Sequence, residues 1–344
     1  MGSRCNILIV DDSAVIRNVL SHALSQHPAI AVVGTAADPY EAREKIKLLD
    51  PDVLLLDVEM PRMNGLDFLE RLMRLRPMPV IMFSSVTAEG SRAAVHALAL
   101  GAVDVQVKPT TGLNDETIQR LSRSILAAKA SKLRLQHNRE GVDPSAPSIP
   151  SIKWNGRTVL IGASTGGVAA IEYILKNLPV GGPPIIIAQH MPKSFLTSFS
   201  ERLATETLHQ VEIADDGAKI EKSHVYVAPG GTVHTGVRKD GSGLKICNFE
   251  GPRTNGHYPS VDELFKSATN FADKIVAVLL TGIGTDGASG IAKLHEAGAV
   301  TLGQDEQTSV VYGMPRAAME RGAITKQLAL GSMPLEIVKL CSVA

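Results

Sequence analysis

The sequence has 344 residues, which is enough for two or three domains with separate cores, and 44% of the residues are hydrophobic while 20% are charged. This composition is typical of an ordinary globular protein. The 35 basic residues are balanced by 35 acidic residues, and no dense block of Lys and Arg occurs. The charge balance therefore argues against a protein whose main partner is a nucleic acid.

The cysteines and the lengths of the apolar runs bear on where in the cell the protein is expected to be. Cys5, Cys247 and Cys341 are odd in number and widely separated, so the sequence predicts neither a disulfide framework nor a zinc site. The first residues run directly into a predicted strand and leave no room for a signal peptide. The longest apolar runs, such as residues 275–280, are too short to span a membrane. We expect a cytoplasmic protein without membrane insertion.

The first 130 residues alternate short apolar runs with longer stretches of helical periodicity. The runs predict strands at residues 7–10, 31–34, 53–56, 80–83 and 103–107. The stretches predict helices at residues 15–24, 40–49, 66–75, 91–100 and 116–133. This alternation is typical of a doubly wound α/β domain with a five-stranded parallel sheet, which places its chemistry at the carboxyl ends of the strands.

Residues with chemical functions follow these predicted strands. Asp11 and Asp12 follow the first strand, Asp57 the third, Ser84 the fourth and Lys108 the fifth. Carboxylates gathered at one edge repel one another, and Mg²⁺ would neutralise them. Lys108 and the Ser84 hydroxyl would then face an incoming phosphoryl group. A single aspartate at a strand end is more often a helix cap, but the five positions together favour a functional site.

Residues 131–153 separate the two halves of the chain. Most of this segment mixes Pro, Ser and Gly, a composition that cannot bury a core and resists helix formation. We predict a semi-extended linker between a domain of residues 1–130 and a second domain of residues 154–344.

The alternation resumes in the second half. Strands are predicted at residues 158–161, 185–188, 224–227, 274–280 and 300–302, and helices at residues 168–177, 194–205, 261–271, 288–297, 317–321 and 335–341. The stretch of residues 232–249, with glycines at its centre, predicts an inserted β-hairpin. The predicted fold is a larger α/β domain with a mostly parallel sheet and this hairpin.

Ser164 lies in the glycine-rich turn of residues 162–167, between a predicted strand and a predicted helix. A serine at such a turn can be a nucleophile if a base accepts its proton and a third group orients that base. His190 and Asp286 also follow predicted strands, so the three side chains can converge at one sheet edge. Nearby glycines would let backbone amides, such as those of Thr165 and Ile283, bind an oxyanion.

Simpler interpretations compete with each of these residues. A lone histidine is more often structural, and an aspartate before glycine is usually a turn or cap residue. The glycine-rich turn could instead bind a nucleotide phosphate, although it matches neither G-x-G-x-x-G nor the P-loop. His257 could line the same cleft, and Ser260 is expected to cap the helix that follows it.

Taken together, the motifs resemble two known families. Residues 1 to about 125 resemble a response-regulator receiver domain, whose acidic-pocket, phospho-acceptor, hydroxyl and lysine positions are filled by Asp11, Asp12, Asp57, Ser84 and Lys108. Residues from about 154 onward resemble the catalytic domain of the chemotaxis protein-glutamate methylesterase. The matching motifs are Gly162 to Gly167, Gln189-His190-Met191-Pro192, Tyr226 to Gly230, Pro259-Ser260-Val261-Asp262 and Leu280 to Gly287.

Two positions depart from the family patterns. Val105 stands where receiver domains commonly carry an aromatic switch residue, so we expect helix movement rather than an aromatic rotamer to carry the signal. Ile283 stands where the methylesterases often have Met, which matters little if only the backbone amide is used.

The resemblance implies hydrolysis of γ-glutamyl methyl esters on methyl-accepting chemoreceptors, and also deamidation of selected glutamines. It implies that Ser164 is the nucleophile, His190 the general base and Asp286 the residue that holds the imidazole tautomer, with no cofactor for this reaction. It further implies that a chemotaxis histidine kinase phosphorylates Asp57, with Mg²⁺ held by the acidic pocket, and that phosphorylation controls access to Ser164. We expect a monomer.

Two other functions stay open. A response regulator with a DNA-binding output would need a basic recognition helix near the end of the chain, and the α/β alternation offers none. A nucleotide-binding module would use the turn at residues 162–167, and labelling of Ser164 by a fluorophosphonate would argue against it.

Overall fold

The computed structural model describes residues 4–60, 63–84, 87–108, 114–137, 153–241 and 243–343, with side chains omitted for residues 132–137. The chain divides into two compact units, residues 1–140 and 141–344, which are considered separately. Residues 131–137, predicted as the start of the linker of residues 131–153, are helical instead. Residues 138–152 of that segment lie outside the described residues.

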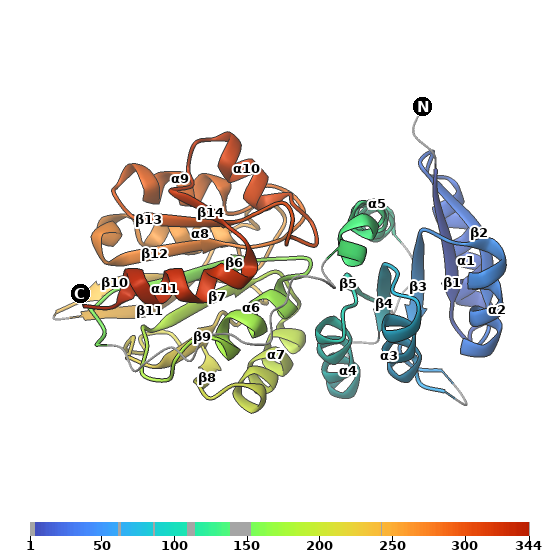
Figure 1. Ribbon diagram of the computed structural model, residues 1–344, viewed down its shortest axis with the longest axis horizontal. Helices are drawn as coiled ribbons and strands as arrows, with labels where there is room; N and C mark the ends of the chain where they lie inside the picture. Colours follow the sequence, from blue (N-terminus) through green and yellow to red (C-terminus); the bar gives the residue numbers. More distant parts are fainter. Residues whose placement is uncertain are drawn as a thin grey trace. The chain divides into compact units, whose positions relative to one another are not determined.

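The first unit is built on a five-stranded parallel sheet with helices on both faces (Figure 1). The strands are β1 (Cys5–Val10), β2 (Ile30–Ala36), β3 (Val53–Asp57), β4 (Val80–Ser84) and β5 (Asp104–Val107). The helices are α1 (Ala14–Ser25), α2 (Pro39–Leu49), α3 (Gly65–Leu75), α4 (Ala88–Ala99) and α5 (Asp115–His137). The predicted doubly wound sheet is confirmed, in the order β2-β1-β3-β4-β5.

Local sequence explains these elements. All five residues of β3 are buried, as expected for a parallel strand covered on both faces. Helices α1 to α4 each begin after a side chain that accepts a hydrogen bond from a first-turn amide, namely Ser13, Asp38, Asn64 and Thr87. The strand order reverses between β1 and β3, so the carboxyl ends of these two strands form the point where such sheets bind ligands.

The second unit is built on a seven-stranded sheet in the order β14-β13-β12-β6-β7-β9-β8, in which every neighbouring pair is parallel. Its strands are β6 (Thr158–Ala163), β7 (Ile185–Gln189), β8 (Gln210–Ile213), β9 (His224–Val227), β12 (Ile275–Leu279), β13 (Val300–Gln304) and β14 (Lys326–Leu328). The predicted hairpin is confirmed as β10 (Val233–Asp240) and β11 (Gly243–Glu250), which pair antiparallel.

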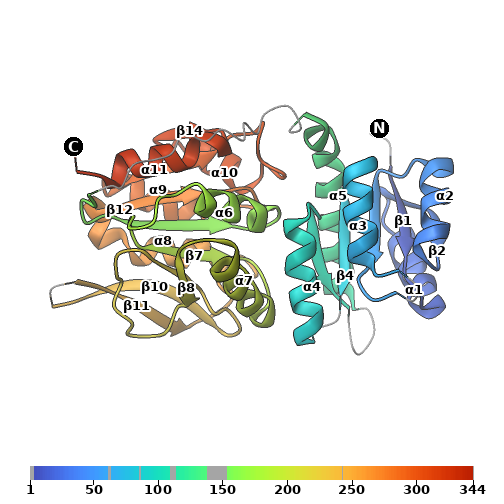
Figure 2. The same cartoon turned by 60° about the horizontal axis from the view of Figure 1, so that its bottom comes forward.

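Helices cover both faces of this sheet. They are α6 (Gly167–Lys176), α7 (Lys193–Glu206), α8 (Val261–Ser267), η2 (Thr269–Lys274), α9 (Ala288–Glu296), α10 (Met314–Glu320), η3 (Leu330–Ser332) and α11 (Met333–Cys341). Figures 1 and 2 show α6, α7 and α11 on one face and α8, α9 and α10 on the other. This division follows from right-handed crossovers that leave the central strand β6 in opposite directions.

Three predicted features differ from the structure. Strands β8 and β14 were not predicted: both lie at sheet edges, are only three or four residues long and consist of exposed and partly exposed residues. The helix predicted for residues 261–271 is instead α8 followed by the 3-10 helix η2. The sequences of these two strands, QVEI and KQL, are too short and too polar to show the apolar run that marks the other strands.

Close packing holds α8 against the carboxyl end of β6. A Cβ atom added at Gly162 would lie 2.1 Å from Val261 Cγ1, which is far inside van der Waals contact. Val261 is fully buried and is the first residue of α8. The glycine therefore brings the start of α8 directly onto the sheet edge where Ser164 follows β6.

We expect Gly162→Ala to destabilise the second unit by about 1–3 kcal/mol, because the added methyl group overpacks the contact with Val261. Urea unfolding measures this, with Gly243→Ala as the control, since a Cβ atom there meets nothing within 4 Å. Equal unfolding midpoints for the two variants would contradict the role of this contact.

Candidate active site

The register of β6 and β7 brings Ser164 next to His190. Ala163 pairs with Gln189, and His190 N donates to Ala163 O at 3.1 Å. Ser164 and His190 are each one residue further along parallel strands that lie about 4.8 Å apart. The Gln189 side chain fixes the turn, because its Nε2 donates to Ser164 O at 2.9 Å. The two predicted residues thus lie side by side at the sheet edge.

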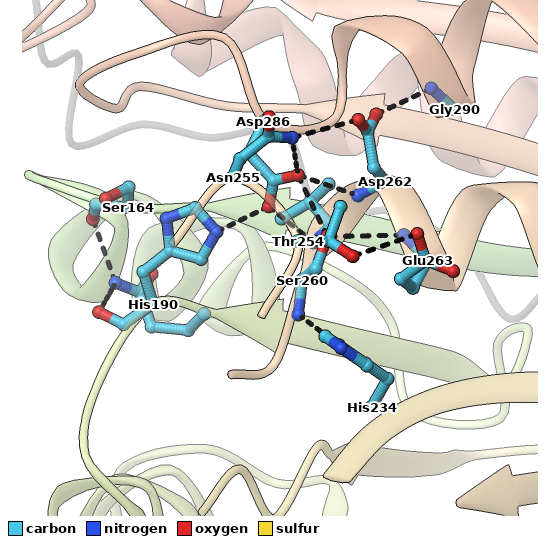
Figure 3. A network of polar contacts seen from close by, with 12 residues as sticks. Ser164, His190, His234, Thr254, Asn255, Ser260, Asp262, Glu263, Asp286 and Gly290 are labelled. Atoms are coloured by element: carbon cyan, nitrogen blue, oxygen red, sulfur yellow. Dashed lines mark hydrogen bonds and ion pairs between the residues drawn. The ribbon is translucent and has the colours of Figure 1, made fainter. Parts of the chain in front are cut away.

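Asp286 completes this group. It follows β12, the neighbour of β6 on the other side, and its Oδ2 lies 2.7 Å from His190 Nε2. Figure 3 shows the imidazole of His190 between Ser164 and Asp286. Because an ionised carboxylate can only accept, Nε2 carries the hydrogen and Nδ1 of the neutral ring keeps its lone pair. Nδ1 is buried and has no hydrogen-bond partner within the described parts of the chain.

The Asp286 carboxylate is buried and surrounded by donors (Figure 3). Besides His190 Nε2, the donors are Asn255 Nδ2 at 2.8 Å, Ser260 Oγ at 2.9 Å, Val261 N at 2.7 Å and Asp262 N at 3.2 Å. Burial by itself would raise the pKa of Asp286, but the hydrogen bond and charge of His190 and the bonds from Asn255 and Val261 hold this pKa well below its ordinary value. Asp286 is therefore a permanent negative charge at neutral pH.

Ser260 has two roles at the start of α8. As predicted, it caps the helix, with Oγ accepting from Glu263 N at 3.3 Å. The same hydroxyl donates to Asp286, a contact that the sequence did not indicate. Behind it, the buried ring of His234 accepts from Ser260 N at 3.2 Å and donates to Pro252 O at 3.0 Å. His234 thus supports Ser260 from the side away from Asp286.

The two amides predicted to bind an oxyanion belong to Thr165, which follows Ser164, and to Ile283, which follows Gly282. Ser164 N donates to Thr281 O at 3.0 Å, and a Cβ atom added at Gly282 would lie 2.7 Å from Ser164 Cβ. Gly282 is itself held, because its N donates to Val311 O at 3.0 Å. Among the residues that the structure describes, neither Thr165 N nor Ile283 N has an acceptor.

The first unit carries a second polar group, at the carboxyl ends of β1, β3 and β5. The carboxylate oxygens of Asp11, Asp12 and Asp57 can all lie within 4.8 Å of one another. Lys108 Nζ lies 2.9 Å from Asp11 Oδ2 and 2.7 Å from Asp57 Oδ2. Ser84 is buried at the end of β4, where its Oγ donates to Gly90 O at 3.2 Å.

This acidic cluster fits Mg²⁺. Mg²⁺ takes oxygen ligands and keeps several waters, and here two buried carboxylates are joined by the exposed Asp12. In the described residues, Asp11 Oδ2 and Asp57 Oδ2 contact no donor except Lys108 Nζ. Burial raises the pKa of Asp57 to about 6, Lys108 lowers it in part, and the charge of Asp11 raises it again. A bound cation would favour the ionised form.

Val105 lies on the edge strand β5 beside a polar network. The Gln106 amide donates to Asp104 Oδ2 at 2.7 Å, and Ser124 Oγ donates to the same oxygen at 2.6 Å. Arg120 Nε donates to Gln106 Oε1 at 3.0 Å. These contacts tie β5 to α5 on either side of the position where an aromatic residue is usual.

Sequence reasoning missed two residues of the site, Asn255 and Asp262, and left His257 undecided. Asn255 Nδ2 donates to both Asp262 and Asp286, and the His257 ring stacks on His190. A usable signal was present in Asn255-Gly256, a dipeptide typical of tight turns. Which carboxylates such a turn would meet is decided by the packing of α8 and α9.

Comparisons with known proteins identify the family of this chain. A family model described as CheB methylesterase matches residues 159–337, more than half of the chain, and a response regulator receiver domain model matches residues 7–120. The chain belongs to the CheB methylesterase family. Family membership makes the chain a hydrolase with a receiver domain, and it replaces the nucleotide-binding and DNA-binding alternatives.

Individual relatives are similar over nearly their whole length. A protein-glutamate methylesterase/protein-glutamine glutaminase of Caulobacter vibrioides is 47% identical, with 99% of both chains covered. One from Rhizobium johnstonii is 45% identical over 99% of this chain and 97% of the relative. The crystal structure of the Thermotoga maritima CheB methylesterase catalytic domain is 33% identical with a TM-score of 0.52, covering 54% of this chain and 99% of that domain.

One further expectation concerns membranes. No helix in the described part of the chain is both long and apolar enough to cross a bilayer.

The raised pKa of Asp57 predicts a pH-dependent stability. Between its ordinary pKa of 3.8 and its folded pKa of about 6, the folded protein keeps a proton that the unfolded chain releases. Stability therefore falls as the pH rises through this window. At pH 7.5 without Mg²⁺, we expect the free energy of unfolding of Asp57→Asn to be about 1–3 kcal/mol higher than that of the wild type, because the substitution removes an ionised buried group.

Chemical unfolding of the first unit at several pH values measures this difference. It should shrink toward zero as the pH falls from 6 toward 4, and Mg²⁺ should stabilise the wild type more than the variant. Glu70→Gln, at an exposed position on α3, is the control. A difference independent of pH would contradict the assignment.

Proposed function

We propose that this chain hydrolyses γ-glutamyl methyl esters of methyl-accepting chemoreceptors in the cytoplasm, with Ser164 as the nucleophile. The observation that supports this most directly is the 2.7 Å hydrogen bond between His190 Nε2 and Asp286 Oδ2, beside a serine that follows the neighbouring strand. This hydrogen bond occupies Nε2, so the lone pair of His190 Nδ1 is available to accept a proton from Ser164. The names of the relatives supply the substrate class.

The reaction proceeds in two halves. Ser164 Oγ attacks the ester carbonyl while His190 Nδ1 accepts its proton, and the Asp286 carboxylate stabilises the imidazolium that results. The amides of Thr165 and Ile283 donate to the oxyanion. The imidazolium of His190 gives this proton to the methoxy oxygen as the bond between that oxygen and the carbonyl carbon breaks, so methanol leaves and an acyl-enzyme remains. Water then attacks the acyl-enzyme, with His190 again accepting and returning the proton. We propose no cofactor for this reaction, and a monomeric enzyme.

Deamidation of glutamine uses the same residues. A glutamine side chain differs from the methyl ester only in its leaving group, which is ammonia instead of methanol. The acyl-enzyme on Ser164 is then identical, and its hydrolysis gives glutamate in both cases. The relatives' names include this second activity.

The first unit supplies control. We propose that Asp57 accepts a phosphoryl group from the phosphohistidine of a chemotaxis kinase and that this raises the esterase activity. Mg²⁺ held by Asp11, Asp12 and Asp57 would offset the negative charge of the incoming group. Lys108, which already contacts two of these carboxylates, would pair with the phosphoryl oxygens. Ser84 would donate to the same group.

We expect Ser164→Ala to abolish methanol release from a methylated receptor fragment, because the proposed nucleophilic hydroxyl is removed. Gas-phase or coupled-enzyme detection of methanol measures this. Ser332→Ala, which changes an exposed serine of the same unit, is the matched control and should keep full activity. Methanol release by Ser164→Ala at the wild-type rate would rule out the proposed nucleophile.

We expect acetyl phosphate with Mg²⁺ to raise methanol release by the wild-type chain and to leave Asp57→Asn unchanged, because the variant has no carboxylate to phosphorylate. The rate is measured with and without the phosphodonor, and with EDTA as a further control. An equal increase in Asp57→Asn would mean that another group is modified.

A further inference from the structure

A tight turn between β11 and α8 lies over the His190–Asp286 pair. Thr254 and His257 form an antiparallel bridge, with His257 N donating to Thr254 O at 3.0 Å. The two central residues, Asn255 and Gly256, have φ angles of 53° and 83°. Positive φ at both central positions is the pattern of a type I′ turn, which favours Asn followed by Gly.

The first side chain of this turn separates two buried carboxylates. Asn255 Nδ2 donates to Asp286 Oδ1 at 2.8 Å and to Asp262 Oδ2 at 3.0 Å, so both of its hydrogens are used. Asp262 and Asp286 are only 4% and 1% exposed. The far oxygen of Asp262 accepts from Gly290 N in α9 at 2.6 Å. A neutral double donor between like charges lowers their repulsion without adding a charge.

Reciprocal hydrogen bonds from these two carboxylates also connect the segment before α9 with α8, and α8 with α9. Asp286 directly precedes α9 but accepts from the amides at the start of α8, whereas Asp262 belongs to α8 and accepts from an amide of α9. Asn255 connects the two acids. The Asp286 carboxylate therefore cannot rotate without breaking its hydrogen bonds to the start of α8 and to the turn.

The last residue of the turn covers His190. The rings of His257 and His190 are stacked, with centroids 3.6 Å apart and planes inclined by 6°. The His190 ring has a hydrogen bond at Nε2, so rotation about that bond would move Nδ1 away from Ser164. A flat ring against its face opposes this rotation.

We propose that residues 254–257 are a positioning clamp for the catalytic pair, in which Asn255 fixes the Asp286 carboxylate and His257 fixes the plane of the His190 imidazole. This inference rests on the proposed function of Ser164, His190 and Asp286. Neither clamp residue needs to touch the substrate. The clamp matters because small displacements of a general base cost large factors in rate.

The residue types favour this role over a merely structural one. The turn conformation alone is satisfied by Gly at position 255, and Asn and Asp both tolerate positive φ. Of these three, only Asn has the two donors that the carboxylates require. The effect of Asn255 on the reaction can thus be separated from its effect on the turn.

The test compares kcat and KM for methanol release in Asn255→Gly and Asn255→Asp. Asn255→Gly keeps the turn and removes the donors, so kcat should fall by roughly 10-fold with KM little changed. Asn255→Asp keeps size and places a third carboxylate beside Asp286 and Asp262, so the loss should be larger, on the order of 100-fold. Wild-type kcat in both variants would overturn the role of Asn255.

A second pair of variants tests the stack. His257→Phe keeps a flat ring and should retain kcat within about threefold, whereas His257→Leu should lose roughly 10-fold. Equal kcat values for these two variants would overturn the role of His257. The unfolding midpoint is measured for each variant, with Ser223→Gly as the control for glycine at another positive-φ position, where φ is 69°.

Ser164→Ala is assayed in the same series. Activity in that variant means that the proposed function fails, whatever the clamp variants do. An inactive Ser164→Ala together with unaffected clamp variants means that the function stands and the clamp fails. The proton between His190 and Asp286 should give a strongly deshielded NMR signal that persists in His257→Phe and weakens in Asn255→Asp.

Discussion

The burial of one carboxylate, Asp286, organises the second unit. An isolated buried charge would be prohibitively unfavourable, so the fold surrounds it with five donors from the turn before α8, the start of α8 and His190. The absence of a side chain at Gly162 lets α8 come close enough to provide two of those donors. The hydrogen bonds that compensate the buried charge of Asp286 also hold this carboxylate in place, and it in turn orients His190.

The second buried aspartate, Asp57, has the opposite character. Burial raises the pKa of Asp57, because the single cation Lys108 offsets burial only in part and the carboxylate of Asp11 lies beside it. Asp286 is also buried, but its shell of donors lowers its pKa. Incomplete compensation suits the proposed role of Asp57 as the acceptor of a phosphoryl group beside a divalent cation. Complete compensation suits a group that must keep its charge and position. Both sites lie where the strand order of a parallel sheet reverses.

Residues that are far apart in the sequence meet at these sites because the strands that they follow are neighbours in the sheet. Ser164, His190 and Asp286 follow three adjacent strands, β6, β7 and β12, although they span more than a hundred positions. The sheet register, rather than any flexible loop, brings the first two together. Their relative positions therefore depend on the most buried part of the unit.

Sequence alone determined the central strands, the hairpin, the two α/β units and the residues at the strand ends, because apolar runs and strand-end side chains are local patterns. It did not reveal β8 and β14, whose short, partly exposed sequences form strands only because a neighbouring strand offers free backbone groups. It also did not reveal Asn255 and Asp262 as partners of Asp286. Their roles arise where α8, α9 and the turn meet, and such contacts between distant segments leave no periodic or compositional signal in the chain.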